Sequence, residues 1–155
     1  TEKDKWQFWI VGKVDPVYFS KLKLQSKKFG IDKKIFFWGF VSEAKKFELL
    51  SRAHIAINPS IREGWGLVVI EAAYVGTPTV AFDVPGLHDS ILNNRTGIIC
   101  DENTVEDLAR KILELIRDAK RYKRISRNAA VWGRRFSWEK SAKKSLTLIE
   151  NLVNI

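Results

Sequence analysis

Short apolar runs, separated by stretches with helical spacing, make up most of this chain. Five of the runs have the length of a strand, are rich in β-branched and aromatic residues, and end near glycine, proline or asparagine. They are residues 6–11, 34–38, 55–58, 78–82 and 98–100. We therefore predict five buried strands.

Apolar residues recur every three or four positions between and after these runs, which predicts helices. The predicted helices are residues 16–29, 42–52, 66–75, 89–92, 104–116, 120–135 and a last one that begins at Ser137. Strands that alternate with helices favour an α/β fold with a doubly wound parallel sheet, here with extra C-terminal helices. The length of 155 residues suits a single domain over residues 1–155.

The loop and helix after the third predicted strand carry the candidate chemistry. Ligands of doubly wound sheets bind beyond the carboxyl ends of the strands, so the loops after strands one to four should share a site. The third of these loops holds Glu63, and the helix after it carries one carboxylate, Glu71, among apolar residues. A carboxylate in such surroundings needs a partner, either ligand hydroxyl groups or a core cation.

Gly64-Trp65-Gly66-Leu67 leads from Glu63 into that helix. Glycine lets backbone N–H groups approach an anion, and the first amides of a helix are unpaired at the positive end of its dipole. The stretch therefore predicts a diphosphate site or, without a ligand, a tight turn. It matches neither Gly-x-Gly-x-x-Gly nor the Gly-Lys-Ser/Thr phosphate loop, which disfavours a nicotinamide dehydrogenase or a nucleoside triphosphatase.

Composition narrows the class of function. Hydrophobic residues make up 45% of the chain, enough for a core, and the single Cys100 excludes an internal disulfide framework. The net charge is +9, and residues 104–155 hold 13 Lys and Arg against 6 Asp and Glu. This basic segment suits an anionic membrane surface, phosphorylated substrates or a solvated helix face. We expect no nucleic-acid partner, because the aromatic residues of that segment have packing positions, and most of the six tryptophans should be core.

Five motifs in order resemble the carboxyl-terminal, donor-binding domain of retaining glycosyltransferases with the two-domain GT-B architecture, specifically glycosyltransferase family 4 (glycosyl transferases group 1). The central motif has two glutamates separated by seven residues, here Glu63 and Glu71. The other four are residues 36–42, 76–81, 84–89 and 136–139. The resemblance covers nearly the whole chain.

The resemblance implies retaining transfer of a hexose from a UDP-, GDP- or ADP-hexose to a lipid-linked or polysaccharide acceptor. Glu63 is the expected catalytic residue, near the C3 hydroxyl of the donor hexose, and Glu71 is expected to bind the ribose. No cofactor and no metal are expected, because the helix dipole and basic side chains stabilise the leaving diphosphate. The backbone of Gly66 and Leu67 is expected to hold the diphosphate, and the turn Val41–Glu43 with Lys46 the base. The expected donor-binding residues are Gly64, Trp65, Gly66, Leu67, Glu71, Val41, Glu43 and Lys46.

Departures from the family pattern limit this expectation. Nothing upstream of Trp6 matches the family's first strand, expected in the middle of the sheet, or the cations expected to hold the diphosphate. Residues 12–15 replace the usual Gly-x-Gly, and Asp89 replaces a common glutamate. The amino-terminal acceptor domain is missing, and there is no methionine, even at position 1. We therefore expect a fragment that by itself binds donor weakly and transfers no sugar.

Two other functions stay open. One is a GT-B relative with different chemistry, such as a sugar-nucleotide epimerase or a phosphorylase. The other is a non-catalytic module whose basic segment binds a membrane or nucleic acid. The glycosyltransferase interpretation predicts a cytoplasmic protein, peripheral at the inner face of the membrane, whose partners are an acceptor lipid or glycan and the N-terminal domain of the same enzyme.

Overall fold

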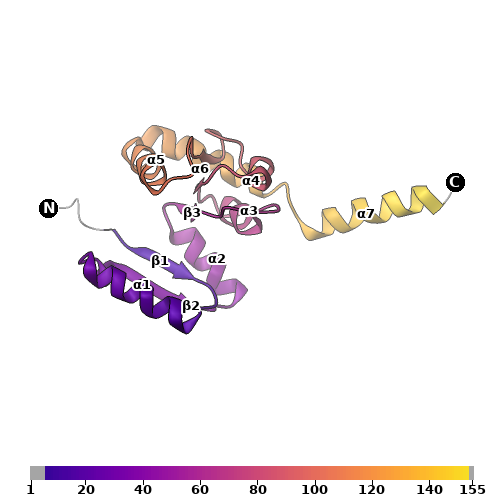
Figure 1. Ribbon diagram of the computed structural model, residues 1–155. Helices are drawn as coiled ribbons and strands as arrows, with labels where there is room; N and C mark the ends of the chain where they lie inside the picture. The colour runs from indigo at the N-terminus through magenta and orange to yellow at the C-terminus, as the bar shows by residue number, and fades with distance from the viewer. Residues whose placement is uncertain (1–5, 154–155) are drawn as a thin grey trace. The chain divides into compact units, whose positions relative to one another are not determined.

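The computed structural model describes residues 6–153. They divide into two compact units, residues 6–46 and residues 47–153. Strands and helices alternate as far as the fifth strand, and only helices follow (Figure 1). This order, with parallel pairing of all five strands, confirms the predicted α/β class.

A two-stranded parallel sheet and one long helix build the first unit. Its elements are β1 (Phe8–Val11), α1 (Pro16–Lys28), the 3₁₀ turn η2 (Asp32–Lys34) and β2 (Ile35–Gly39). Parallel strands need a crossover connection, which α1 provides. The ring of Phe19 in α1 packs edge to face on Phe37 of β2, with 4.8 Å between their centroids.

The second unit has a three-stranded parallel sheet in the order β3-β4-β5. Its elements are β3 (Ala56–Asn58), α3 (Leu67–Tyr74), β4 (Thr79–Ala81), α4 (Pro85–Ser90), β5 (Gly97–Ile99), α5 (Val105–Arg117), α6 (Ala119–Gly133) and α7 (Trp138–Val153). The helix α2 (Glu43–Arg52) crosses the boundary between the units. Every residue of β4 and β5 is buried, which explains why these strands are continuous apolar runs.

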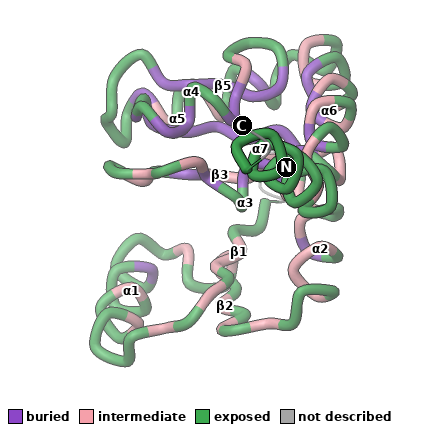
Figure 2. The backbone as a smooth tube through the Cα atoms, turned by 90° about the vertical axis from the view of Figure 1, so that its right-hand side faces the viewer, coloured by how far each residue is buried: buried purple, intermediate pink, exposed green. Residues whose placement is uncertain are grey.

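Two clusters of buried residues cover the two faces of this second sheet. Figure 2 shows the buried residues of this unit in purple. Ala81 of β4 belongs to a cluster with Val69 of α3 and Leu87 of α4. Its neighbour Val80 belongs to a second cluster, with Leu115 of α5. Because successive side chains of a strand point to opposite faces, β4 connects two layers of helices.

The helix α6 also packs on α3. A Cβ at Gly133 of α6 would come within 2.3 Å of the Tyr74 backbone nitrogen, so only glycine allows this approach. Ser126 Oγ of α6 donates to the Gly76 carbonyl at 2.7 Å, just after α3 ends. These contacts fix the helix that carries Glu71.

The strands predicted in one sheet are found in two, because β1 pairs with β2, and β3, β4 and β5 pair with one another. The prediction that a family strand is missing upstream of Trp6 concerns residues outside the described part of the chain. That residues 1–155 form a single domain stays a prediction.

Two predictions were wrong in detail. The short helix expected at residues 89–92 is α4, which begins at Pro85 because proline fits the first turn of a helix. None of the six tryptophans, all within residues 6–153, is fully buried, and Trp138 is 80% exposed. Every described side chain of α7 is exposed as well.

Candidate functional site

The chain after β3 is held in a fixed turn. Asn58, the last residue of β3, is buried, and its Oδ1 accepts the backbone N–H of Ser60 at 3.0 Å. Its carbonyl accepts the N–H of Phe82, just after β4, at 3.0 Å. The segment that carries Glu63 therefore starts at the carboxyl end of the sheet, where parallel α/β folds bind ligands.

Residues 63–66 form a loop, here called the 63–66 loop, whose last residue, Gly66, is the N-cap of α3. Gly66 has φ 74° and ψ 59°, a left-handed conformation that glycine adopts most readily. Its carbonyl accepts the N–H of Val69 at 2.8 Å, and no side chain caps the helix. The first two amides of α3, those of Leu67 and Val68, have no intrahelical acceptor and can bind an anion.

Along the chain, one of the two glutamates comes before this N-terminus and the other after it. Glu63 is half-buried in the loop, and Glu71 is half-buried in α3. Leu67, Val68 and Tyr74, on the same stripe of α3 as Glu71, have exposed fractions of 56%, 45% and 50%. The helix is therefore not buried all round, and apolar surface is exposed on the stripe that carries Glu71. Such a stripe suits a ligand that carries hydroxyl groups on a ring.

Gly86 of α4 lies directly against the 63–66 loop. A Cβ at Gly86 would come within 2.0 Å of the Glu63 backbone oxygen and 2.6 Å of the Gly64 oxygen. A Cβ at Gly66 would come within 2.6 Å of Leu87 Cδ2. At Gly86 the loop thus rests on the backbone of α4 with no side chain between them, and at Gly66 it rests on the Leu87 side chain. In the sequence, Gly86 stands out only as part of the residue 84–89 motif, because no local pattern shows which segment it contacts.

The loop before α4 is itself braced by polar contacts. Asn103 Nδ2 donates to the Asp83 carbonyl at 2.8 Å, and Asn103 Oδ1 accepts the Asp83 N–H at 2.6 Å. The Asp83 carboxylate also forms a hydrogen bond with His88 Nε2 of α4. The half-exposed His88 therefore has a partner within this loop and helix.

The predicted base-binding residues lie in and next to the turn between β2 and α2, in the first unit. The Lys46 N–H donates to the Ser42 carbonyl at 2.9 Å, which starts α2. Lys46 Nζ forms an ion pair with Glu43 Oε1 at 2.8 Å. The structure thus brings Glu43 and Lys46 together, just after Val41, in a different unit from the 63–66 loop.

Within residues 6–153, no group of three or more His, Cys, Asp and Glu side chains is placed to hold a metal ion. None of the helices described there is long and apolar enough to cross a membrane.

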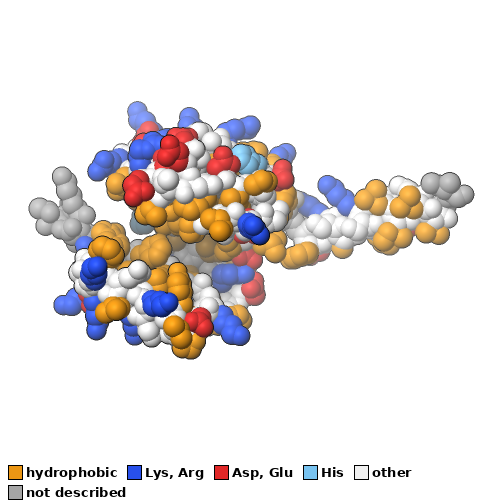
Figure 3. Space-filling model, viewed as in Figure 1, with side chains coloured by type: hydrophobic (Ala, Val, Ile, Leu, Met, Phe, Trp, Pro, Cys, Tyr) orange, Lys and Arg blue, Asp and Glu red, His pale blue; other side chains and the backbone are white. Residues whose placement is uncertain are grey.

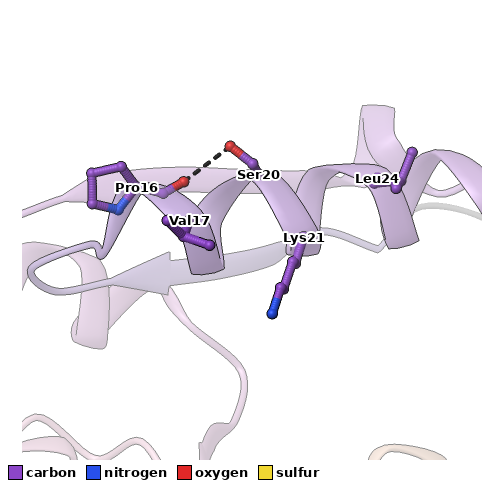
Figure 4. A pocket seen from close by; sticks show the side chains of 5 residues that line it. All are labelled: Pro16, Val17, Ser20, Lys21 and Leu24. Atoms are coloured by element: carbon purple, nitrogen blue, oxygen red, sulfur yellow. Dashed lines mark hydrogen bonds between the residues drawn. The ribbon is translucent and has the colours of Figure 1, made fainter.

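A hollow of about 520 Å³ lies along α1, away in sequence from the predicted donor residues (Figure 4). It is lined by Pro16, Val17, Ser20, Lys21 and Leu24. Ser20 Oγ donates to the Pro16 carbonyl at 2.9 Å, and Lys21 is the one charged residue of this lining. These residues form no catalytic constellation, so we place the candidate site at the 63–66 loop and α3.

Comparison with known proteins points to one family. The family described as glycosyl transferases group 1 matches residues 1–132. Glycogen synthase of Mycobacterium tuberculosis is 33% identical over 105 residues, which are 68% of this chain and 25% of that protein. An uncharacterized glycosyltransferase of Methanocaldococcus jannaschii is 32% identical over 91 residues, 59% of this chain and 26% of that protein. The chain thus spans about a quarter of the length of these curated relatives.

Solved structures share the fold. Sucrose-phosphate synthase from Thermosynechococcus elongatus aligns with a TM-score of 0.87 and 25% identity, over 96% of this chain and 39% of that one. The Anabaena protein HepE, in complex with UDP, aligns with a TM-score of 0.82 and 22% identity, over 98% of this chain and 42% of that one. These likenesses identify the fold as that of a GT-B carboxyl-terminal domain. Because the family match covers most of its residues, the chain belongs to the glycosyl transferases group 1 family.

Proposed function

We propose that this chain is the donor-binding part of a retaining, family 4 glycosyltransferase that moves a hexose from a nucleotide sugar to a lipid-linked or polysaccharide acceptor. The observation that carries the proposal is the pair Glu63 and Glu71, which come just before and just after the uncapped N-terminus of α3 along the chain. Helix N-termini favour phosphate groups, and carboxylates favour hydroxyl groups, so this arrangement suits a sugar joined to a nucleoside diphosphate.

Each group then has a role. The amides of Gly66 and Leu67 hold the diphosphate, Glu71 accepts hydrogen bonds from the ribose hydroxyls, and Glu63 accepts one from the hexose. The dipole of α3 stabilises the charge that develops on the leaving diphosphate, so the transfer needs no metal ion and no protein nucleophile. The turn Val41–Glu43 and Lys46 receive the base.

Similar proteins support a nucleotide-sugar donor. HepE has been solved with UDP and also with UDP-glucose, the latter with a TM-score of 0.81 and 22% identity over 96% of this chain and 41% of that one. Because the curated relatives are about four times longer than their match to this chain, we propose that an N-terminal domain of the same enzyme binds the acceptor. From the positive net charge, we also propose that the enzyme works at the cytoplasmic face of a membrane.

Calorimetric and NMR titrations of the 155-residue chain with UDP-, GDP- and ADP-glucose test the proposal. We expect one of the three to bind. Glu71→Gln should weaken the nucleoside diphosphate itself about tenfold, the loss of one charge-assisted hydrogen bond. Glu63→Gln should leave the binding of the nucleoside diphosphate unchanged and remove the additional affinity that the hexose gives the nucleotide sugar.

The matched control is Glu106→Gln, which neutralises an exposed carboxylate in the first turn of α5, and which we expect to bind like the wild type. A folded chain that binds none of the three donors would contradict the proposal. Product analysis with the full-length protein separates a glycosyltransferase from a sugar-nucleotide epimerase or a phosphorylase.

A further inference from the structure

Aromatic side chains connect the 63–66 loop to the junction between α6 and α7. The half-buried Trp65 ring packs edge to face on Phe136, with 5.5 Å between centroids and an interplanar angle of 67°. Phe136 packs in the same way on Trp132, at 5.1 Å and 79°. Edge-to-face contacts set both the distance and the direction of the rings, so Trp65 is oriented as well as covered.

The other end of this stack is anchored on α4. Trp132 Nε1–H donates to the carbonyl of Ser90, the last residue of α4, at 2.9 Å. Gly86, near the start of the same helix, supports the backbone of Glu63 and Gly64. The loop is thus held from two directions, by the backbone of α4 and by a stack that starts from the end of α4.

We propose that Trp65, Phe136 and Trp132, the aromatic brace, position the 63–66 loop for donor binding, and that Phe136 is a positioning residue for Glu63. The inference rests on the proposed function of Glu63. Phe136 acts through Trp65, two residues from Glu63, and needs no contact with the donor. This gives the phenylalanine at the start of the residue 136–139 motif a task at a site far away in the sequence.

The brace is tested first without any ligand. Phe136→Leu keeps an apolar side chain but removes the ring, whereas Phe136→Tyr keeps the ring. In ¹⁵N NMR spectra of the 155-residue chain, Phe136→Leu should shift the amide signals of Glu63, Gly64 and Gly66. Phe136→Tyr should leave these signals near their wild-type positions. Phe47→Leu is the control for the loss of an aromatic pair, since the half-buried Phe47 packs edge to face on Tyr74 at 6.2 Å.

Donor binding is the second readout. Phe136→Leu should weaken the binding of UDP-glucose, or of whichever donor the wild type prefers, about tenfold. The binding of the nucleoside diphosphate alone should be weakened less. In the double variant with Glu63→Gln, the two losses should not add, because Phe136 acts through Glu63. If Phe136 had only a structural role, the losses of donor affinity in the two variants would add, and the binding of the donor and of the nucleoside diphosphate would be weakened equally.

If Phe136→Leu does not fold, Trp132→Phe is the second variant: it removes the indole N–H bond to Ser90 and leaves a smaller ring against Phe136. It must still shift the Trp65 indole and Glu63 amide signals. Unchanged loop signals, or equal loop shifts in Phe47→Leu, would overturn the brace. A wild-type chain that binds no donor would instead contradict the proposed function. The NMR comparison of the free chain would decide the brace in that case too.

Discussion

At the scale of single residues, Gly66 is the glycine of the 63–66 loop at which a side chain would be most strained. Its φ of 74° strains any other residue, and a Cβ would lie 2.6 Å from Leu87 Cδ2. We expect Gly66→Ala to lower the free energy of unfolding by about 1–3 kcal/mol. Gly64→Ala is the control, because a Cβ there meets no atom within 4 Å, and should change it by less than about 0.5 kcal/mol.

Urea unfolding followed by circular dichroism measures both changes. Equal values for the two variants would mean that the loop is not held against α4. The sequence identifies the glutamates and glycines of this loop, because their types and spacing are local. It does not identify Gly86 or Phe136 as supports, because which backbone a glycine or a ring touches depends on how distant segments pack.

At the scale of elements, one carboxylate joins the N-terminus of α5 to the turn that follows β5. Asp107 Oδ2 accepts the backbone N–H groups of Asp101 at 2.7 Å and Glu102 at 3.0 Å, and its own N–H donates to Thr104 Oγ1 at 3.2 Å. The hydrogen bond from the Glu102 backbone, followed by that from Arg110, holds the pKa of Asp107 below its ordinary value. The carboxylate therefore stabilises the fold only while it is ionised.

This arrangement predicts a pH-dependent effect of Asp107→Asn. Because the pKa of Asp107 is lower in the folded chain than in the unfolded one, its contribution is fully present above pH ~4 and is lost as the pH falls through the folded value. We expect the variant to have a lower Tm than the wild type at pH 7, with a difference that shrinks steadily below pH ~4. Thermal unfolding at a series of pH values measures it.

Glu106→Gln, in the same helical turn, is the matched control for removing a carboxylate, and should show no such convergence with the wild type. A Tm difference for Asp107→Asn that stays constant down to pH ~2 would contradict the assignment.

Which elements form was predictable, because periodicity and capping residues are local signals. Thr104 and Ser137 precede α5 and α7, where the sequence placed them. Side-chain burial was harder to predict. The apolar surface of α3 is half exposed, and α7 has no buried side chain, because burial depends on which element covers which face.

At the scale of the whole molecule, α7 should add little to the stability of the second unit. All sixteen of its residues are exposed, so the clusters around β4 and β5 form without it. We expect removal of residues 138–155 to change the free energy of unfolding by less than about 1 kcal/mol, measured by urea unfolding. A larger loss would show that α7 packs on this unit in solution.

Charge is distributed differently in the folded chain from what the sequence suggested. Two basic residues of α5 form ion pairs: Arg110 contacts Asp101, Asp107 and Glu114, and Lys111 contacts Asp101. In the first unit, residues 6–46 hold nine lysines against three acidic residues, and α1 has four lysines and no acidic residue. Figure 3 shows several of the basic side chains of this unit at the surface. The membrane proposal therefore has a second candidate surface in the first unit, besides the basic C-terminal segment.

Neutralising α1 tests this placement. Lysines near an anionic surface contribute about 1 kcal/mol each, so Lys21→Gln, Lys27→Gln and Lys28→Gln together should weaken binding to phosphatidylserine-rich vesicles about 100-fold at low salt. The comparison variant, Lys120→Gln, Lys123→Gln and Arg124→Gln in α6, removes the same charge from the C-terminal segment, and a smaller effect than that of the α1 variant would place the lipid-binding surface in the first unit. Sedimentation with vesicles at rising salt measures both. Equal losses would mean that net charge alone drives binding, and retained nucleotide-sugar binding in the α1 variant would separate the membrane surface from the donor site.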